Sequence, residues 1–300
     1  MGDNILIGTR QAQGATQAAD EIDGVLYPRV KLILGADGVN DGDVSASNPL
    51  HMASRGDDIA MGLDPTHTGF RKFGYNSELE VPLYVVCSLL DQTLPWMPLV
   101  AQEVEIVSAS TTDKLGGLGA QKVAVVGLDE NWDEQIVEVT MNGDVPVVLS
   151  GYDWRRIYRA YVTSMGTYRG SNVGIITISE AESPAASIIQ IDATQGQTFT
   201  THYCVPRNRV LLVKNWNLFG QAGKVLHFEF QVAPNANDLT VPYSGAVRTQ
   251  LNLENDGEAM QGTFEVPFTA QAYTDMWAAA SIASGDSSLF FEYSGCLVTM

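Results

Sequence analysis

Four carboxylates lie within six residues of the stretch GLDENWDEQ: Asp129, Glu130, Asp133 and Glu134. Clustered carboxylates can bind a divalent metal ion or carry general acid and base catalysis. They stand between the apolar runs KVAVVGL and QIVEVTM, so strand patterning places them in a loop where Asp is common. A catalytic pair also needs a second group aimed at the same point, and the sequence offers none. We therefore expect four solvent-exposed turn residues with neither a metal ion nor a catalytic role.

The remaining candidates for chemistry are isolated. The four histidines occupy unrelated local contexts, and no HExxH, GxSxG, P-loop or GxGxxG pattern follows a suitable strand. The turn-rich stretch 37–48 lacks two of the ligands of a calcium loop, so it is interpreted as a turn. The three cysteines lack metal-ligand spacing and are expected to be small buried residues: Cys87, Cys204 and Cys296. The sequence thus predicts a protein that is not an enzyme and has no cofactor or metal.

Aromatic residues cluster between positions 132 and 161 and allow two interpretations. In a carbohydrate-binding or receptor-binding module, an exposed Trp132 or Trp154 would stack on a sugar. In a structural protein, the same rings would fill a core or a subunit interface, where aromatic side chains bury large areas. We favour the second interpretation and name four candidate structural or interface residues: Trp132, Trp154, Tyr158 and Tyr161.

Charge and hydropathy restrict the partners. The formal net charge is -18 at pH 7, and binding to phosphate backbones requires clustered Lys and Arg, so neither nucleic acid nor an anionic membrane is an expected partner. The basic residues in 155–169 and 207–214 are flanked by acidic segments and are expected to be solvated or ion-paired at the surface. No apolar run reaches the roughly 18 to 20 residues that span a bilayer, and the N-terminus lacks a signal-peptide pattern.

The elements that must position these residues are predicted to be strands. From about residue 104, ten short runs rich in Val, Ile and Phe are separated by Gly, Asn, Asp or Pro. Asn142-Gly143 predicts a type I′ hairpin between QIVEVTM and VPVVLS. A helix is predicted only near 270–283. The fold class is all-β, an antiparallel β-sandwich, as one sandwich or two packed ones, with an extended N-terminal arm.

Three regions are expected along the chain. Residues 1–50 form an assembly arm, in which 9–24 are an extended arm or a short helix and 27–35 form an isolated strand. Residues 51–103 form a connecting β region, and residues 104–300 form the sandwich region. Because the first region cannot close a core alone, we expect it to dock on a neighbouring subunit.

Four segments in a fixed order resemble a family of tailed-bacteriophage virion structural proteins. They are KFGYNSELE, then the GLDENWDEQ stretch with its Asn-Gly turn, then WRRIYRAYVTSMGTYRGSNVGIITI, then GQTFTTHYCVP. The stretch 27–50 is similar to a short module near the N-termini of phage structural and fibre-associated proteins. Two positions depart from the family pattern, since Asp144 follows Asn-Gly in place of Thr and His51 follows Leu50 in place of Pro-Val.

The resemblance implies architecture and assembly rather than catalysis. The expected protein is a non-enzymatic virion component, made in the host cytoplasm, that is tail- or fibre-associated or decorates the head. Its expected partners are copies of itself, with a trimer as one option, and other virion proteins. A role in host attachment, with a host glycan as ligand, stays open as the alternative.

Overall fold

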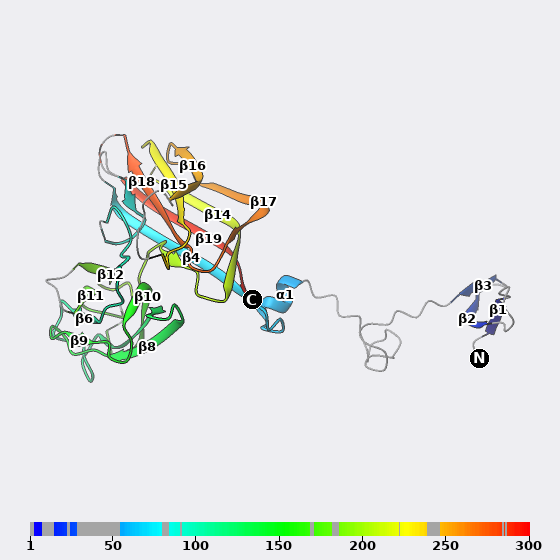
Figure 1. Ribbon diagram of the computed structural model, residues 1–300, viewed down its shortest axis with the longest axis horizontal. Helices are drawn as coiled ribbons and strands as arrows, with labels where there is room; N and C mark the ends of the chain where they lie inside the picture. Colours follow the sequence, from blue (N-terminus) through cyan, green and yellow to red (C-terminus); the bar gives the residue numbers. More distant parts are fainter. Residues whose placement is uncertain are drawn as a thin grey trace. The chain divides into compact units, whose positions relative to one another are not determined.

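A computed structural model describes residues 3–7, 15–22, 25–28, 55–79, 84–90, 92–168, 171–181, 186–221, 223–238, 247–283, 285 and 287–300 (Figure 1). The chain divides into two compact units, Met1–Asp57 and Asp58–Met300. The predicted all-β class is confirmed, because strands dominate the described residues of both units and the strand pairs are antiparallel. Within the described ranges, the helical segment is the short α1 (Arg55–Ala60).

The N-terminal unit contains a three-stranded antiparallel sheet in the order β1-β2-β3. Its strands are β1 (Asp3–Ile7), β2 (Ala15–Ile22) and β3 (Val25–Pro28). The option of a short helix within 9–24 was therefore wrong, because β2 occupies most of that stretch. The strand predicted for 27–35 overlaps β3 only at its start. The rest of that prediction, and the calcium-loop comparison at 37–48, lie outside the described residues.

The larger unit contains two pairs of sheets, each pair enclosing its own core. The first pair, which we call the C-terminal sandwich, has one sheet in the order β17-β14-β19-β4. Its strands are β17 (Met260–Ala270), β14 (Arg209–Gly220), β19 (Ser287–Thr299) and β4 (His67–Leu79). The opposing sheet contains β13 (Tyr203–Cys204), β18 (Asp275–Ile282), β15 (Leu226–Ala233) and β16 (Arg248–Asn255), with β5 (Val85–Val86) paired to β18.

Alternation of side chains explains why these sheets face each other. In β15, Leu226, Phe228 and Phe230 are fully or almost fully buried while the residues between them are partly exposed. The rings of Phe228 and Phe230 contact aromatic residues of β19 across the core, with 4.6 Å between the ring centroids of Phe228 and Phe291. Strands β4 and β5 belong to this sandwich, so the region expected only to connect supplies two of its strands.

The second pair of sheets, the inserted sandwich, is formed by residues between β5 and β13. One sheet has the order β10-β7-β8, with β10 (Trp154–Met165), β7 (Ala120–Asp129) and β8 (Glu134–Thr140). The other has the order β12-β11-β6-β9, with β12 (Ser187–Ile191), β11 (Ile176–Glu180), β6 (Val104–Ser108) and β9 (Val147–Val148). Aliphatic residues from both sheets surround the fully buried Trp154.

The helix predicted near 270–283 was wrong, because β17 ends at Ala270 and β18 follows. The sequence DMWAAASI lacks strand alternation since every residue of β18 is buried. Ala278 and Ala280 face the main core of the C-terminal sandwich, whereas Trp277 and Ala279 pack with Val86 in a smaller cluster. A strand covered on both faces gives a continuous apolar run, which periodicity cannot separate from a buried helix.

The hairpin predicted at Asn142-Gly143 was also wrong. Strand β8 pairs with β7, whereas β9 pairs with β6 of the opposing sheet, so the chain crosses between sheets at this point. Gly143 has a φ of 69°, but Asn142 does not have the second positive φ that a type I′ turn requires. Gly143 instead exchanges backbone hydrogen bonds with Ser108 and Asp113.

Candidate functional site

The four carboxylates do lie in the turn between β7 and β8, but they are not equally exposed. Glu130 and Glu134 are exposed, and Asp133 is partly exposed and forms an ion pair with Arg207. Asp129 is only 4% exposed, which corrects the expectation of four solvated acids. Its carboxylate accepts hydrogen bonds from the backbone N–H groups of residues 131 and 133 and from Gln135 Nε2, at 2.8 to 3.0 Å. This carboxylate therefore organises the turn.

Trp132 closes the same turn in a left-handed conformation, with a φ of 65°. Its backbone N–H donates to the carbonyl of Asp129, at 3.0 Å, as in a type I turn followed by a left-handed residue. Its ring meets Tyr273 edge to face at a centroid distance of 5.6 Å. The Arg156 guanidinium lies 5.2 Å from the indole centroid. The side chain is only 8% exposed and belongs to the core cluster of the C-terminal sandwich. Trp132 therefore links the inserted sandwich, which contains its turn, to the C-terminal one.

The other aromatic candidates are separated because β10 is irregular, with register shifts between Trp154 and Arg156 and between Ile157 and Arg159. Trp154 is fully buried in the core of the inserted sandwich, whereas Tyr158 faces the C-terminal sandwich and lies 4.9 Å from the ring of Tyr203. Tyr161 is partly buried beside Arg159. A carbohydrate module built on an exposed Trp132 or Trp154 is inconsistent with this burial, so that form of the alternative was wrong.

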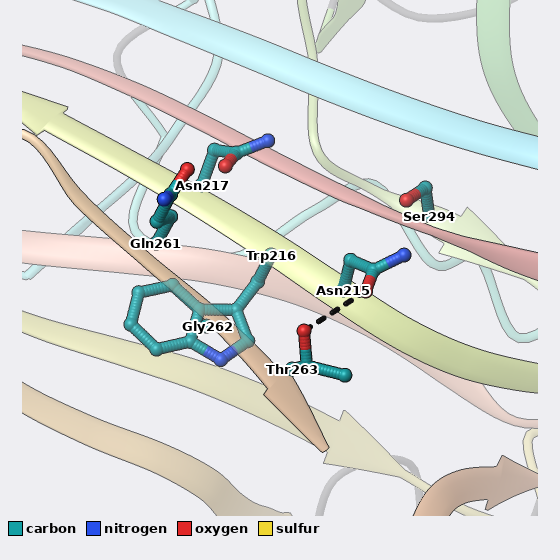
Figure 2. A pocket seen from close by; sticks show the side chains of 7 residues that line it. All are labelled: Asn215, Trp216, Asn217, Gln261, Gly262, Thr263 and Ser294. Carbon is teal, nitrogen blue, oxygen red and sulfur yellow. Dashed lines mark hydrogen bonds between the residues drawn. The ribbon is translucent and has the colours of Figure 1, made fainter. Parts of the chain in front are cut away.

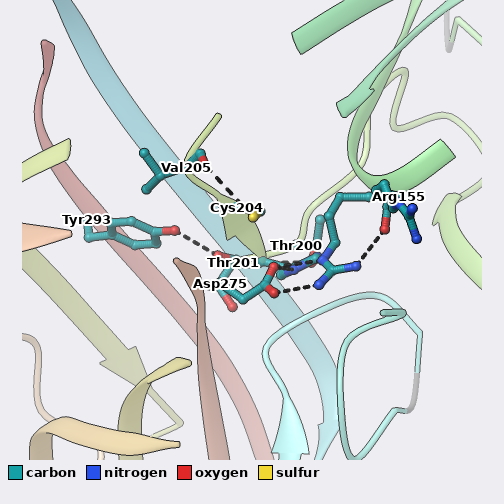
Figure 3. Close-up of polar contacts among 9 residues, drawn as sticks. Arg155, Thr200, Thr201, Cys204, Val205, Asp275 and Tyr293 are labelled. Carbon is teal, nitrogen blue, oxygen red and sulfur yellow. Dashed lines mark hydrogen bonds and ion pairs between the residues drawn. The ribbon is translucent and has the colours of Figure 1, made fainter. Parts of the chain in front are cut away.

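A buried ionic cluster joins β10 to the C-terminal sandwich (Figure 3). Arg156 donates two hydrogen bonds to Asp275, from Nε to Oδ1 at 2.9 Å and from Nη2 to Oδ2 at 2.7 Å. His202 Nε2 lies 3.1 Å from Asp275 Oδ1. Burial acts to raise the pKa of Asp275, but Arg156 and His202 outweigh it and hold the pKa below its usual range. Arg156, expected at the surface, is only 3% exposed.

A cleft, which we call the junction cleft, opens beside this cluster. It has a volume of about 250 Å³ and is lined by residues of β4, β13 and β19 of one sandwich and of β7, β8 and β10 of the other. Phe70 and Tyr203 both line it, with 4.7 Å between their ring centroids. Its other polar or aromatic lining residues are Thr68, Arg71, Lys72, Glu134, Tyr158, Arg159 and Tyr161.

Two buried polar groups of the junction cleft stand out among the described residues. Lys72 is 8% exposed, donates to the carbonyl of Tyr158, and forms no ion pair with a carboxylate of the described part. Burial, assisted by Arg159, lowers the pKa of Lys72 to about 7. Tyr203 is 3% exposed and its hydroxyl has no hydrogen-bond partner there. A buried polar group without a partner is costly, so both groups retain capacity for a ligand.

A second, shallower depression lies on β14, β17 and β19 of the C-terminal sandwich (Figure 2). Its volume is about 620 Å³, and its polar side chains are Asn215, Asn217, Gln261, Thr263 and Ser294. Thr263 Oγ1 donates to Asn215 Oδ1 at 3.1 Å. Uncharged polar side chains are normal on the solvent face of an antiparallel sheet, so this surface indicates no particular ligand.

The sequence did not single out Lys72, Tyr203 or Asp275. Lys72 lies in β4 and Asp275 in β18, two strands that the sequence pattern did not predict, and the proximity of the three residues depends on pairing between distant strands. No group of three or more His, Cys, Asp or Glu residues in the described part is arranged to hold a metal ion. No helix within those same ranges is long and apolar enough to cross a membrane.

Comparison with known proteins gives no family. No family model matches the chain, and no curated protein matches it. Among solved structures, the infectious bursal disease virus Gt strain gives a TM-score of 0.22 at 11% identity, covering 78% of this chain and 72% of that chain. The structure of the Gx strain gives a TM-score of 0.17 at 11% identity, covering 78% of this chain and 81% of that chain. Similarity at this level carries no argument, so functional reasoning rests on the residues of this chain.

Proposed function

We propose that this chain is a non-enzymatic structural protein of a tailed-bacteriophage virion, acting through subunit contacts as a tail- or fibre-associated or head-decorating component. In this proposal it assembles with copies of itself and with other virion proteins, and it resides in the virion. One of the four phage-like segments contains β10, and the other three contact this strand at the boundary between the two sandwiches. This convergence is the observation that carries the proposal.

Hydrogen bonds show the convergence directly. The KFG segment reaches β10 through Lys72, which donates to the carbonyl of Tyr158. The GQT segment reaches it through Gly196, whose carbonyl accepts from the backbone of Val162, and through Thr198, whose backbone N–H donates to the carbonyl of Ala160 at 2.9 Å. The GLD segment lies in β7, which pairs with β10 along its length. The four segments are thus parts of one junction.

Two glycines of these segments allow the backbones to approach closely. A Cβ added at Gly74 would lie 2.3 Å from the carbonyl oxygen of Cys87, and one added at Gly127 would lie 2.1 Å from that of Arg156. Contacts this short exclude any side chain, so glycine is required for packing at both positions. Residue types fixed by packing support an architectural role for the segments that resemble the phage family.

The surface of the larger unit is compatible with assembly. Strand β8 lies at the end of its sheet and carries Ile136, which is 65% exposed, while Val266 of the terminal strand β17 is 82% exposed. Edge strands can pair with a neighbouring chain through backbone hydrogen bonds. The net charge of -18 disfavours nonspecific binding to nucleic acid. We therefore infer that subunit contacts use sheet edges and the separate N-terminal unit.

The proposal is tested by locating the protein in particles. Phage particles assembled with a tagged chain are purified, and the tag is localised by immunogold electron microscopy and its copy number measured by quantitative mass spectrometry. We expect a fixed copy number at one position of the particle. A protein found in infected cells but absent from purified particles would contradict the proposal.

Truncation before Asp58 gives a matched test of the N-terminal unit. The larger unit has its own cores, so the truncated chain should fold but fail to enter particles. A control with Arg248→Gln, an exposed position on β16, should enter particles normally. Normal incorporation of the truncated chain would exclude an assembly role for residues 1–57.

A further inference from the structure

The junction cleft combines features that an assembly junction does not need. Lys72 and Tyr203 both line a space of about 250 Å³, and their amine and hydroxyl groups are buried there; the hydroxyl of Tyr203 has no hydrogen-bond partner in the described structure, and the amine of Lys72 has the carbonyl of Tyr158. In an interface with only a structural role, replacing such groups with apolar ones is often neutral or stabilising. Their presence beside an open cleft therefore points to a ligand.

The charges of the cleft favour a ligand with one negative charge. Lys72 lies at its base and Arg159 in its wall, whereas Arg71 is already paired with Glu292 at 2.7 Å. Glu134 brings one negative charge, and its Oε1 accepts a hydrogen bond from the Tyr158 hydroxyl at 2.6 Å. A carboxylate would pair with Arg159 and with the protonated form of Lys72, while Glu134 would repel a phosphate dianion more strongly than a carboxylate.

The remaining surfaces favour a sugar ring. Phe70 and Tyr161 present aromatic surfaces in the wall, and apolar ring faces of this kind pack against the C–H groups of a pyranose. Glu134 can accept hydrogen bonds from sugar hydroxyls, and the Tyr203 hydroxyl can donate one. The volume lies below the roughly 300 to 1,000 Å³ of pockets for drug-sized ligands, so it fits a single small unit.

We propose that the junction cleft binds one carboxylate-bearing sugar unit of an acidic polysaccharide, with Lys72 and Arg159 on the carboxylate, Tyr203 and Glu134 on hydroxyls, and Tyr161 against the ring. This inference goes beyond the assembly function, because a particle component requires no glycan to assemble. It also differs from the sugar site considered as an alternative in the sequence analysis, which used Trp132 or Trp154, both of which are buried.

Binding is measured with the full chain by isothermal titration calorimetry and saturation-transfer NMR. The probes are glucuronate and N-acetylneuraminate, with glucose as the uncharged sugar and acetate as the carboxylate without a ring. We expect at least one acidic sugar to bind, and glucose and acetate to bind at least about tenfold more weakly, as expected when a charge-assisted contact or the ring contacts are lost.

Variants assign the binding to the cleft. Arg159→Gln and Lys72→Met should each weaken acidic-sugar binding by about tenfold or more, and Tyr203→Phe, which keeps the ring in place, should weaken it about threefold to tenfold. Arg248→Gln removes an exposed cation of β16 that is not among the residues lining the cleft and should leave binding unchanged. Far-ultraviolet circular dichroism checks that each variant is folded.

Three outcomes would overturn the inference. They are no binding by either acidic sugar, equal binding of acetate and the acidic sugars, and binding that Arg159→Gln and Tyr203→Phe leave intact. The particle incorporation of Tyr203→Phe is measured separately. A Tyr203→Phe chain that enters particles but loses sugar binding would support both proposals. A wild-type chain that binds the sugar but does not enter particles would contradict only the assembly function.

Discussion

At the scale of single residues, burial separates side chains that the sequence presents as equivalent. Asp129 and Glu130 are adjacent acids in one turn, yet one accepts three hydrogen bonds from the chain and the other is exposed. The sequence locates the turn correctly because the flanking strands are regular. It does not show which acid turns inward, because that depends on the strand end and on Gln135 of the next strand.

Alanine substitutions should separate these two acids. Asp129→Ala leaves three donors of the turn without their acceptor and should lower the free energy of unfolding by about 1 to 3 kcal/mol or more. Glu130→Ala removes an exposed side chain and should change it by less than about 0.5 kcal/mol. Urea denaturation followed by tryptophan fluorescence measures both. Equal effects would show that Asp129 does not organise the turn.

Trp132 combines a buried ring with a strained backbone, and two substitutions distinguish these contributions. Both Trp132→Ala and Trp132→Gly lose the ring contacts, a loss of about 3 to 5 kcal/mol for buried aromatic residues. Glycine adopts a φ of 65° without the steric cost that alanine bears, about 1 to 2 kcal/mol. Trp132→Gly should therefore be the more stable variant in urea denaturation, and the opposite order would contradict the left-handed conformation.

Lys72 should make stability depend on pH. Its pKa is about 7 in the folded protein and about 10.4 in an unfolded chain, so between these values the unfolded state binds more protons. From about pH 7 to 8, stability should therefore rise with pH, by at most about 1.4 kcal/mol per pH unit, whereas at higher pH the thiols of Cys87 and Cys204, whose pKa values burial raises, oppose the rise. Lys72→Met should abolish this rise, whereas Lys122→Met, at a lysine paired with Glu138 on the surface, should retain it. Urea denaturation at several pH values checks the slope.

At the scale of elements, sequence patterns identify strands whose two faces differ and miss strands whose faces are alike. Strand β15 alternates and was predicted, whereas β18 is buried on both faces and was taken for a helix. The long strand β4 was not predicted because glycine and polar residues interrupt its pattern. Three of its polar residues line the junction cleft: Thr68, Arg71 and Lys72. The junction cleft was therefore not predictable, because its lining residues come from six strands that meet only in the folded chain.

Strand β4 also offers a matched pair of glycines. Gly74→Ala places a methyl group 2.3 Å from the Cys87 carbonyl oxygen and 2.6 Å from the Thr201 nitrogen, so it should destabilise the protein by about 1 to 3 kcal/mol or more. Gly69→Ala meets no atom within 4 Å and should be neutral or slightly stabilising. Thermal denaturation measures the difference, and similar melting temperatures would contradict the close approach at Gly74.

At the scale of the whole molecule, the two compact units make independent folding testable. A chain truncated before Asp58 should keep the strand-rich circular dichroism spectrum and the cooperative unfolding transition of the larger unit, because its cores are formed by residues 70–297. Its free energy of unfolding should match that of the same transition in the full chain. A truncated chain that aggregates or unfolds without cooperativity would show that the N-terminal unit takes part in the core.

The pairing of β4 with β19 has a consequence for how the protein is made. These two strands are the first long strand and the last strand of the larger unit, and they pair from His67 opposite Val298 to Leu79 opposite Ser287. A ribosome releases residue 67 long before residue 298, so the C-terminal sandwich cannot close until translation is almost complete. The inserted sandwich, formed by 104–191, can fold earlier. Nascent chains arrested near residue 240 should therefore protect the inserted sandwich from protease while β4 remains cleavable.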